Sequence, residues 1–155
     1  MGILSLLGWA DACGEPAYYR PLREEDFVAA VVQLRQAITQ DDGHAMGLYA
    51  SLLALGRGVE ADPVEACAWF RQSAVRGDRF GQLSFGLCLV IGFGVAADWI
   101  EASLWIYRAA RAGMREAKEV LRDLVEFDPA LLDQHFSREE YFALVAGLPR
   151  TETLQ

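Results

Sequence analysis

The sequence has 155 residues, of which 53% are hydrophobic and 23% are charged, so it is long enough for one folded domain and is not intrinsically disordered. Its 22 acidic and 14 basic side chains give a formal net charge of −8. This balance argues against binding to nucleic acid or to an anionic membrane surface, and it favours a basic protein as the partner.

The first 16 residues, MGILSLLGWADACGEP, contain a short apolar stretch without the features of a targeting signal. No lysine or arginine precedes the apolar residues, and Asp11 interrupts a faint lipoprotein cleavage box. Ser5 is not at the position that an N-myristoylation motif requires. We therefore expect residues 1–22 to be retained as a segment that packs on the domain, in a cytoplasmic protein.

Residues 41–77 and 77–113 are two copies of one pattern. When the second stretch is laid under the first at an offset of 36 residues, many positions are identical, and ten of them mark the pattern. In the first copy they are Gly56, Gly58, Val59, Ala61, Asp62, Glu65, Ala66, Trp69, Ala74 and Gly77. Such a repeat predicts an array of helical hairpins.

Each copy predicts two helices joined by a glycine turn. Asp62, followed three residues later by Glu65, has the spacing of a capping box at the start of the second helix, and Asp98 and Glu101 repeat this spacing. Gly77 is expected to end that helix in a left-handed conformation. The GRG and GFG stretches are expected to reverse the chain between the two helices.

The flanking segments look like degenerate repeats. Ala30, in DFVAAVVQLRQAITQ, lies one period before Ala66 and predicts a preceding helix of the second type. Ala117 and Leu121 predict a third helix of the first type, and a further helix is expected to begin at Ser137 with another capping box. We expect seven or eight helices and no sheet.

This pattern resembles the Sel1-like repeat family, a branch of the tetratricopeptide-type α-solenoids. The match to A-x-x-x-L-G-x-x-Y-x-x-G-x-G-V-x-x-D-x-x-x-A-x-x-W-Y-x-x-A-A-x-x-G covers about half of the chain and holds twice in register. Leu53 and Leu89 depart from it, because the family usually has tyrosine there. The resemblance implies an all-α fold, a short right-handed α-solenoid of helix-turn-helix repeats with capping helices over 23–149, and a tail at 150–155.

The stretch GQLSFGLCLVIGFGVAADW, at 81–99, has two competing interpretations. Gln82, Ser84 and four glycines within fewer than 20 residues argue against a membrane span. The form G-x-G-x-x-A imitates a dinucleotide fingerprint, but GRGVEA has the same form 36 residues earlier. Both are therefore predicted to be turns between the helices of a repeat.

No catalytic, cofactor-binding or metal-binding residues are predicted. Cys13, Cys67 and Cys88 have no CxxC spacing, and the last two lie in apolar helical patterns, which favours small buried side chains in a reducing compartment. His44 and His135 lack metal-ligand spacing. An enzyme would require one of these histidines beside carboxylates with perturbed pKa values.

By analogy with tetratricopeptide repeats, the first helix of each hairpin is expected to line a concave groove. In the first copy the groove-facing residues would be His44, Gly47, Ser51, Ala54 and Leu55, and in the second Phe80, Leu83, Leu87, Val90 and Ile91. In the third helix they would be Glu116, Glu119, Asp123 and Glu126. The groove would therefore run from apolar to acidic.

Two interpretations of this face remain open. In the first, residues 1–22 or the C-terminal helices cover its apolar part and make it core. Alternatively, the apolar part and the acidic stripe together form a site for a protein partner, with Tyr18, Tyr19, Phe93 and Trp99 as further contact residues, since aromatic side chains are enriched at interfaces.

The favoured function is a non-enzymatic protein-binding module, a monomer or weak homo-oligomer without a cofactor. The resemblance implies adaptor roles, and some bacterial relatives resemble immunity proteins that neutralise toxins. An acidic single domain would suit the inhibition of a basic cytosolic toxin, such as a nuclease. The alternative is a regulatory or assembly adaptor in a bacterial signalling or envelope pathway.

Overall fold

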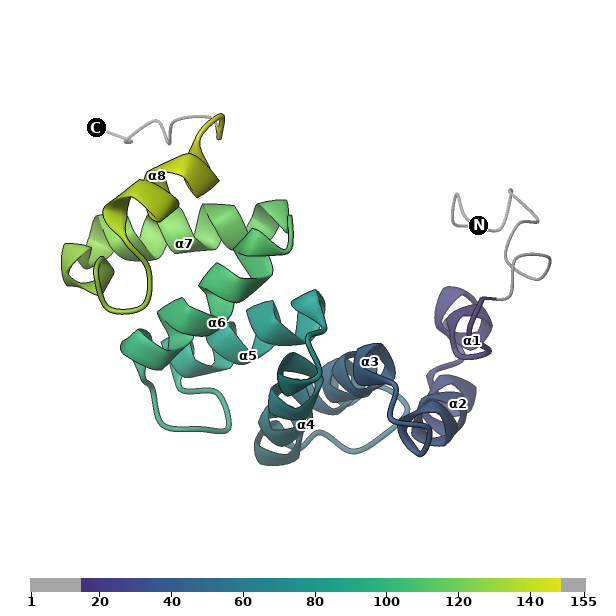
Figure 1. The fold of residues 1–155 in the computed structure, drawn as a ribbon. Helices are drawn as coiled ribbons and strands as arrows, with labels where there is room; N and C mark the ends of the chain where they lie inside the picture. The colour runs from purple at the N-terminus through teal and green to yellow at the C-terminus, as the bar shows by residue number, and fades with distance from the viewer. Residues whose placement is uncertain (1–14, 149–155) are drawn as a thin grey trace, which may run out of the picture.

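The computed structural model describes residues 15–148, which form eight α-helices, one short 3-10 helix and no strand. In chain order these are α1 Tyr19–Arg23, α2 Phe27–Ile38, α3 Gly43–Leu55, α4 Pro63–Val75, α5 Arg79–Ile91, α6 Trp99–Arg111, α7 Arg115–Phe127, η2 Pro129–Leu131 and α8 Arg138–Val145. The elements follow one another along an arc, from α1 and α2 at one end to α7 and α8 at the other (Figure 1). The all-α prediction and the expected number of helices are confirmed.

The 36-residue period of the sequence is also the period of the helices. The first-type helices α3, α5 and α7 each contain 13 residues and begin at Gly43, Arg79 and Arg115. The second-type helices α4 and α6 follow the same offset, and α2 precedes α4 by one period. The degenerate repeats expected at both ends are thus present, as α2 before the two clear copies and α7 after them.

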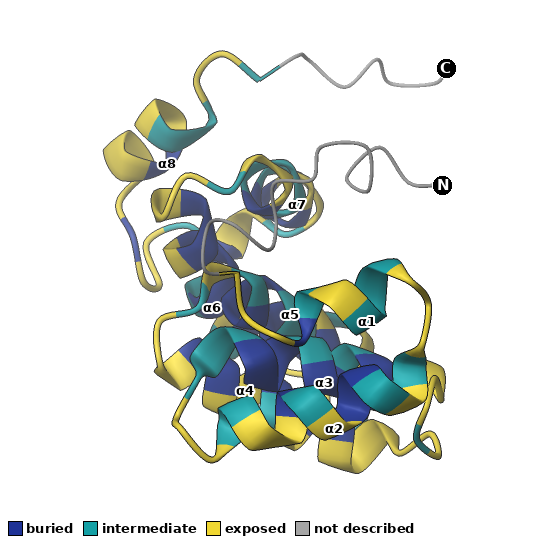
Figure 2. Cartoon of the chain, turned by 90° about the vertical axis from the view of Figure 1, so that its right-hand side faces the viewer, coloured by how far each residue is buried: buried dark blue, intermediate teal, exposed yellow. Residues whose placement is uncertain are grey.

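Helices pack mainly on their neighbours in the chain. Helix α3 contacts α2, α4 and α5, and α6 contacts α5 and α7. The buried sides of α3 to α6 therefore face one another, and the exposed sides lie outward (Figure 2). Fully buried Leu34 and Tyr49 belong to a cluster at the α1–α4 end, whereas Ile106 and Leu121 belong to a larger cluster over α3–α8.

Aspartate N-caps begin most of the helices, because a carboxylate accepts hydrogen bonds from backbone N–H groups that the first turn leaves unpaired. The capping residues are Asp26, Asp42, Asp62, Asp78 and Asp98. Helix α7 differs, since Met114 occupies the cap position and makes no side-chain hydrogen bond. The capping box predicted at Ser137 is confirmed, with Glu140 bonded back to the Ser137 N–H.

The capping boxes predicted in the two clear repeats are only half formed. Asp62 and Asp98 accept the expected backbone hydrogen bonds. Glu65 does not return to the cap residue; instead its carboxylate accepts a hydrogen bond from Trp69 Nε1 at 3.1 Å. Glu101 accepts one from the indole of Trp105 at the same distance. The tryptophan lies one helical turn later on the same face, so it competes successfully for the glutamate.

The glycine turns dock on the preceding repeat. Gly58 has φ +69° and Gly94 has φ +66°, and a Cβ atom on either would collide with backbone at the start of the preceding second-type helix, at Phe27 and Pro63 respectively. Glycine is needed at both positions for conformation and for space.

The stretch 81–99 is confirmed as part of α5, a turn and the first residue of α6. In the described part of the chain, no helix is long and apolar enough to cross a membrane.

The two cysteines that the structure describes are free thiols, and both are buried. Burial raises the pKa of Cys67, and it raises the pKa of Cys88 to about 12. Both cysteines therefore stay protonated at neutral pH and pack as small apolar groups, as predicted. Cys13 and the other residues of 1–14 lie outside the described residues, as do Pro149, the last residue of the expected domain, and the tail at 150–155.

Candidate protein-binding surface

Three exposed hydrophobic side chains recur at one position of successive repeats. Leu55, Ile91 and Phe127 are the last residues of α3, α5 and α7, and they are 64%, 71% and 78% exposed. We call these three residues the apolar row. Isolated exposed hydrophobic residues are common, whereas the same exposure at one position of consecutive repeats provides several apolar side chains that one partner could cover.

The aromatic end of the apolar row is held in place by α6. The Trp99 ring lies 5.2 Å from the Phe127 ring, centroid to centroid. Trp99 Nε1 also donates a hydrogen bond to the carbonyl oxygen of Val90 at 3.1 Å, which orients the indole against the C-terminal turn of α5. Trp99, predicted as a contact residue, is thus partly buried beside the apolar row. Phe93, also predicted, is partly buried against both core clusters.

The predicted contact residues of α5 differ in exposure. Leu87 is 38% exposed, one turn before Ile91, and Phe80 is partly buried. Leu83 is only 8% exposed and belongs to the core cluster, so its assignment to an open groove is corrected. Leu83 faces the core, where its side chain contributes to stability. The α5 face is therefore open near its C-terminus and largely closed near its middle.

The four acidic residues predicted on α7 remain accessible, but basic neighbours offset part of their charge. Glu119 pairs with Arg115 at 3.0 Å, and Asp123 pairs with Arg122 at 3.2 Å. Arg122 also lies 4.0 Å from Glu126, while Glu116 is exposed in the first turn of the helix. Exposed pairs of this kind are weak, so these carboxylates can still attract a basic surface.

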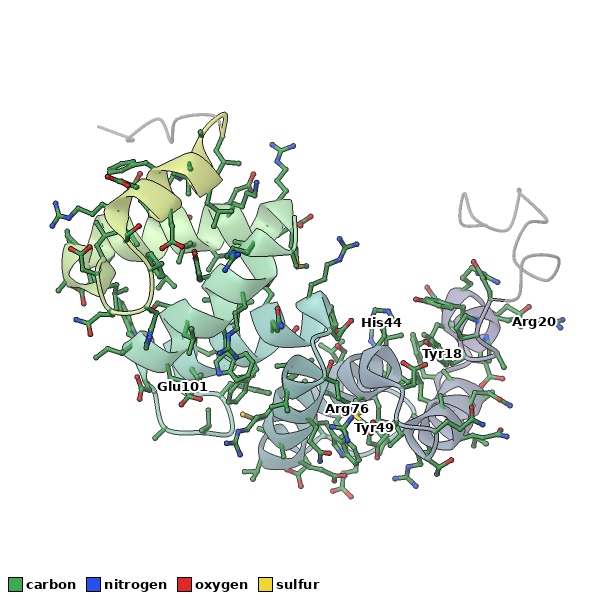
Figure 3. The ribbon with its side chains drawn as sticks, in the orientation of Figure 1. Tyr18, Arg20, His44, Tyr49, Arg76 and Glu101 are labelled. Atoms are coloured by element: carbon green, nitrogen blue, oxygen red, sulfur yellow. The ribbon has the colours of Figure 1, made fainter. Side chains whose placement is uncertain are left out.

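The predicted tyrosines lie at the other end of the arc. Tyr18 is buried, and its hydroxyl donates a hydrogen bond to Asp42 at 3.1 Å, so this residue holds α1 on the first turn of α3 and is corrected from contact residue to core (Figure 3). Burial raises the pKa of Tyr18. The Tyr19 ring is partly exposed, 6.2 Å from the ring of His44, which lies 6.3 Å from Phe80.

His44 meets one condition for catalysis, because its Nδ1 lies 3.0 Å from Asp78. That hydrogen bond raises the pKa of His44. Burial opposes ionisation of Asp78, but hydrogen bonds from His44, the Gly81 N–H and Ser73 lower its pKa. Asp78 is the N-cap of α5, and Ser73 is fully buried and donates to Asp78 rather than to His44. The geometry is that of a helix cap, in which the buried Ser73 hydroxyl bonds to the capping carboxylate.

Metal binding finds no support in the part of the chain that the structure describes, where no three His, Cys, Asp or Glu side chains are grouped to hold an ion. His135 is exposed.

Sequence reasoning missed Phe127 as a member of the exposed surface. The signal was available, since Phe127 follows Leu55 and Ile91 at the same 36-residue offset.

Comparison with known proteins identifies the fold. No family model and no curated protein sequence matches the chain. Among solved structures, a Sel1 repeat protein from Oxalobacter formigenes has 25% identity and a TM-score of 0.67 over 71% of this chain. The protective antigen c5321 of uropathogenic Escherichia coli strains, which displays an SLR fold, has 21% identity and a TM-score of 0.69 over 89%.

The chain spans 44% of the length of the first of these proteins and 32% of the second. The similarity therefore concerns the repeat array and not the whole of either protein. The chain has the Sel1-like repeat fold, as its sequence motif predicted, and this fold supports a protein-interaction module.

Proposed function

We propose that this chain with a Sel1-like repeat fold is a non-catalytic immunity protein, which binds and neutralises a basic toxin or effector in the bacterial cytoplasm. The observation that carries the proposal is the apolar row at the ends of α3, α5 and α7, next to the acidic side chains of α7. The net charge of −8 adds to this local field. A partner with apolar side chains surrounded by lysine and arginine would match both features.

The two features would contribute at different stages of binding. The apolar row supplies side chains that lose contact with water when a partner covers them, and such burial mainly slows dissociation. The α7 carboxylates and the net charge attract a basic surface over a longer range, which mainly speeds association and weakens with salt. A protein that inhibits by occupying its partner needs both properties and no chemistry of its own.

The proposal is tested by co-expressing the chain with each basic protein encoded by a neighbouring gene. We expect one of these proteins to stop growth when expressed alone, and to be neutralised in a stable complex with the chain. A complex that forms with a neighbouring signalling or envelope protein, without any protection of cells, would contradict immunity and support the adaptor alternative. Failure to bind any of them would contradict both.

A pair of matched variants locates the contact. Replacing Ile91 and Phe127 together with serine should raise the dissociation constant for the neutralised partner at least about tenfold, which corresponds to about 1.4 kcal/mol. Val75 and Phe142 are exposed to a similar degree but lie outside the apolar row, so their replacement with serine is the control. Equal weakening by both pairs, measured by surface plasmon resonance, would reject the apolar row as the contact.

A further inference from the structure

A pocket of about 320 Å³ lies between the two second-type helices α4 and α6, with α5 behind it. Its wall is mostly apolar and includes Cys67 and Ala68 from α4 and Phe85 from α5. Two charged side chains, Arg71 and Glu101, complete it. No residue of the apolar row or of the acidic face of α7 lines this pocket, so it is separate from the proposed partner surface.

The preceding repeat provides an internal reference for this pocket. Six of the nine lining residues are identical to their counterparts 36 residues earlier, among them Arg71, which corresponds to Arg35. The three that differ are Cys67, Ala68 and Phe85, where the preceding repeat has Val31, Val32 and Tyr49. Each difference makes the side chain smaller or removes a polar atom.

The surrounding framework is the same in both repeats. The ring of Tyr49 lies 5.8 Å from that of Trp69 at an interplanar angle of 79°, and the ring of Phe85 lies 5.7 Å from that of Trp105 at 73°. Each tryptophan also donates its indole N–H to the glutamate one turn earlier, at 3.1 Å. The aromatic rings therefore have equivalent positions in the two repeats, which differ at this place by the three replaced side chains.

The preceding repeat shows which kind of group the guanidinium can bind at this position. In the preceding repeat, Arg35 Nη2 donates a hydrogen bond to the Tyr49 hydroxyl at 2.8 Å, and the guanidinium lies 5.4 Å from the ring centroid. Phe85 has no hydroxyl to offer Arg71. Among the described residues the Arg71 side chain makes no hydrogen bond or ion pair. The pocket therefore lacks the phenol oxygen that its counterpart contains, and has the space that two valine side chains would otherwise reduce.

We propose that this pocket binds a 4-hydroxyphenyl group from outside the chain, with its ring against Phe85, Cys67 and Ala68 and its oxygen hydrogen-bonded to Arg71. The volume is at the lower end for small-molecule sites and suits one substituted aromatic ring. An oxygen acceptor at the rim uses the guanidinium as Tyr49 uses Arg35, and the ring covers the exposed apolar side chains of Val64 and Ala68.

The test is a titration of the full chain with p-cresol, followed by amide chemical shifts. Saturable shifts are expected at Cys67, Ala68 and Val95, with a dissociation constant in the range of about 1 mM that suits so small a ligand. Toluene, which lacks the oxygen, should bind at least about fivefold more weakly. The Arg71→Met variant should reduce the affinity for p-cresol to a similar extent and leave that for toluene unchanged.

Variants that restore the preceding repeat provide the matched test. Cys67→Val, Ala68→Val and Phe85→Tyr together should reduce p-cresol binding more than tenfold, because the chain then fills the space and occupies Arg71 itself. Ala68→Val alone changes an exposed position and should still weaken binding several-fold in a folded protein. Absence of saturable shifts in the wild type, or unchanged binding in these variants, would overturn the proposal.

A second ligand distinguishes the two possible sources of the 4-hydroxyphenyl group, a tyrosine side chain of another protein and a free phenol. Binding of N-acetyltyrosinamide as tightly as p-cresol supports a tyrosine side chain of another protein, whereas binding of p-cresol alone supports a free phenol. The readout is ligand binding to the isolated chain. The result therefore tests the pocket proposal independently of whether the chain neutralises a toxin.

Discussion

At the scale of single residues, one hydrogen bond joins two repeats through a group that titrates near neutral pH. His44, in the first turn of α3, bonds to Asp78, the N-cap of α5, and the bond raises the pKa of the histidine. Asp42 lies near enough to add to this effect, while burial and Arg79 oppose it. Folding therefore favours the protonated imidazole over its state in the unfolded chain.

The sign of the resulting pH dependence follows directly. A raised folded-state pKa gives a stabilisation that is complete below the unfolded value of about 6.5 and is lost as the pH rises through the folded value. The His44→Gln variant should therefore lose more stability at pH 5.5 than at pH 8.5. Because the side chain is 37% exposed, solvent screening limits the expected difference to about 0.5 kcal/mol, measured by urea unfolding.

Asp78→Asn provides the control for this prediction. Asparagine caps a helix about as well as aspartate, but it carries no charge to favour the imidazolium. In the Asp78→Asn background, the cost of the His44→Gln substitution should differ much less between the two pH values, because only the smaller effect of Asp42 remains. An unchanged pH dependence in that background would assign the effect to Asp42 instead.

At the scale of the helices and turns, the second glycine of each G-x-G turn sets how closely one hairpin approaches the next. Gly94 combines φ +66° with a position against the Pro63 carbonyl. Gly94→Ala should therefore incur both a left-handed conformation, at about 1–2 kcal/mol, and a backbone collision, for a total of about 3 kcal/mol or more. Thermal or urea unfolding measures this loss.

Gly113→Ala separates the two contributions. Gly113 has φ +87°, but no atom lies within 4 Å of the position that its Cβ would occupy. The substitution should therefore cost only the conformational part, about 1–2 kcal/mol. Equal losses at Gly94 and Gly113 would show that the turn relaxes away from Pro63 and that its close approach is not required.

Most of the helices and turns could be predicted from the sequence because the same pattern of residues occurs twice in the chain. An identical residue at the same offset, such as Gly58 and Gly94, marks a position where backbone conformation and packing allow little else. The hydrogen-bond partner of the Glu65 carboxylate was not predictable from spacing alone, because both the N–H of the cap residue and the Trp69 indole N–H are possible donors. Helix α1 and the 3-10 helix η2 have no counterpart in the repeat, so no internal comparison could reveal them.

The candidate sites were predictable only in part, since they depend on where repeats differ and not on where they agree. Leu83 and Ile91 both fit a groove-facing pattern, but only packing against neighbouring helices decides that Leu83 is buried and Ile91 exposed. The pocket beside Arg71 requires knowing that Cys67 and Ala68 lie next to one aromatic ring. Three-dimensional proximity supplies that information.

At the scale of the whole molecule, the arc contains two clusters of buried side chains instead of one central core. Leu34, on α2, lies in the cluster at the α1–α4 end, and Leu121, on α7, lies in the larger cluster. Both side chains are fully buried. Contacts run mainly between elements that are close in the chain, so each cluster depends chiefly on its local helices.

This organisation predicts that stability is lost locally. Leu34→Ala should cost about 2–5 kcal/mol in the α1–α3 region, as expected for a cavity at a fully buried leucine. In native-state hydrogen exchange, the amides of α2 and α3 should lose protection, while those of α6 and α7 keep most of theirs. Leu121→Ala is the mirror variant and should affect α7 and α8 while sparing α2. A uniform loss of protection along the chain in either variant would instead show that the two clusters unfold as a single cooperative unit, because α3 and α4 couple the ends of the arc more tightly than nearest-neighbour packing implies.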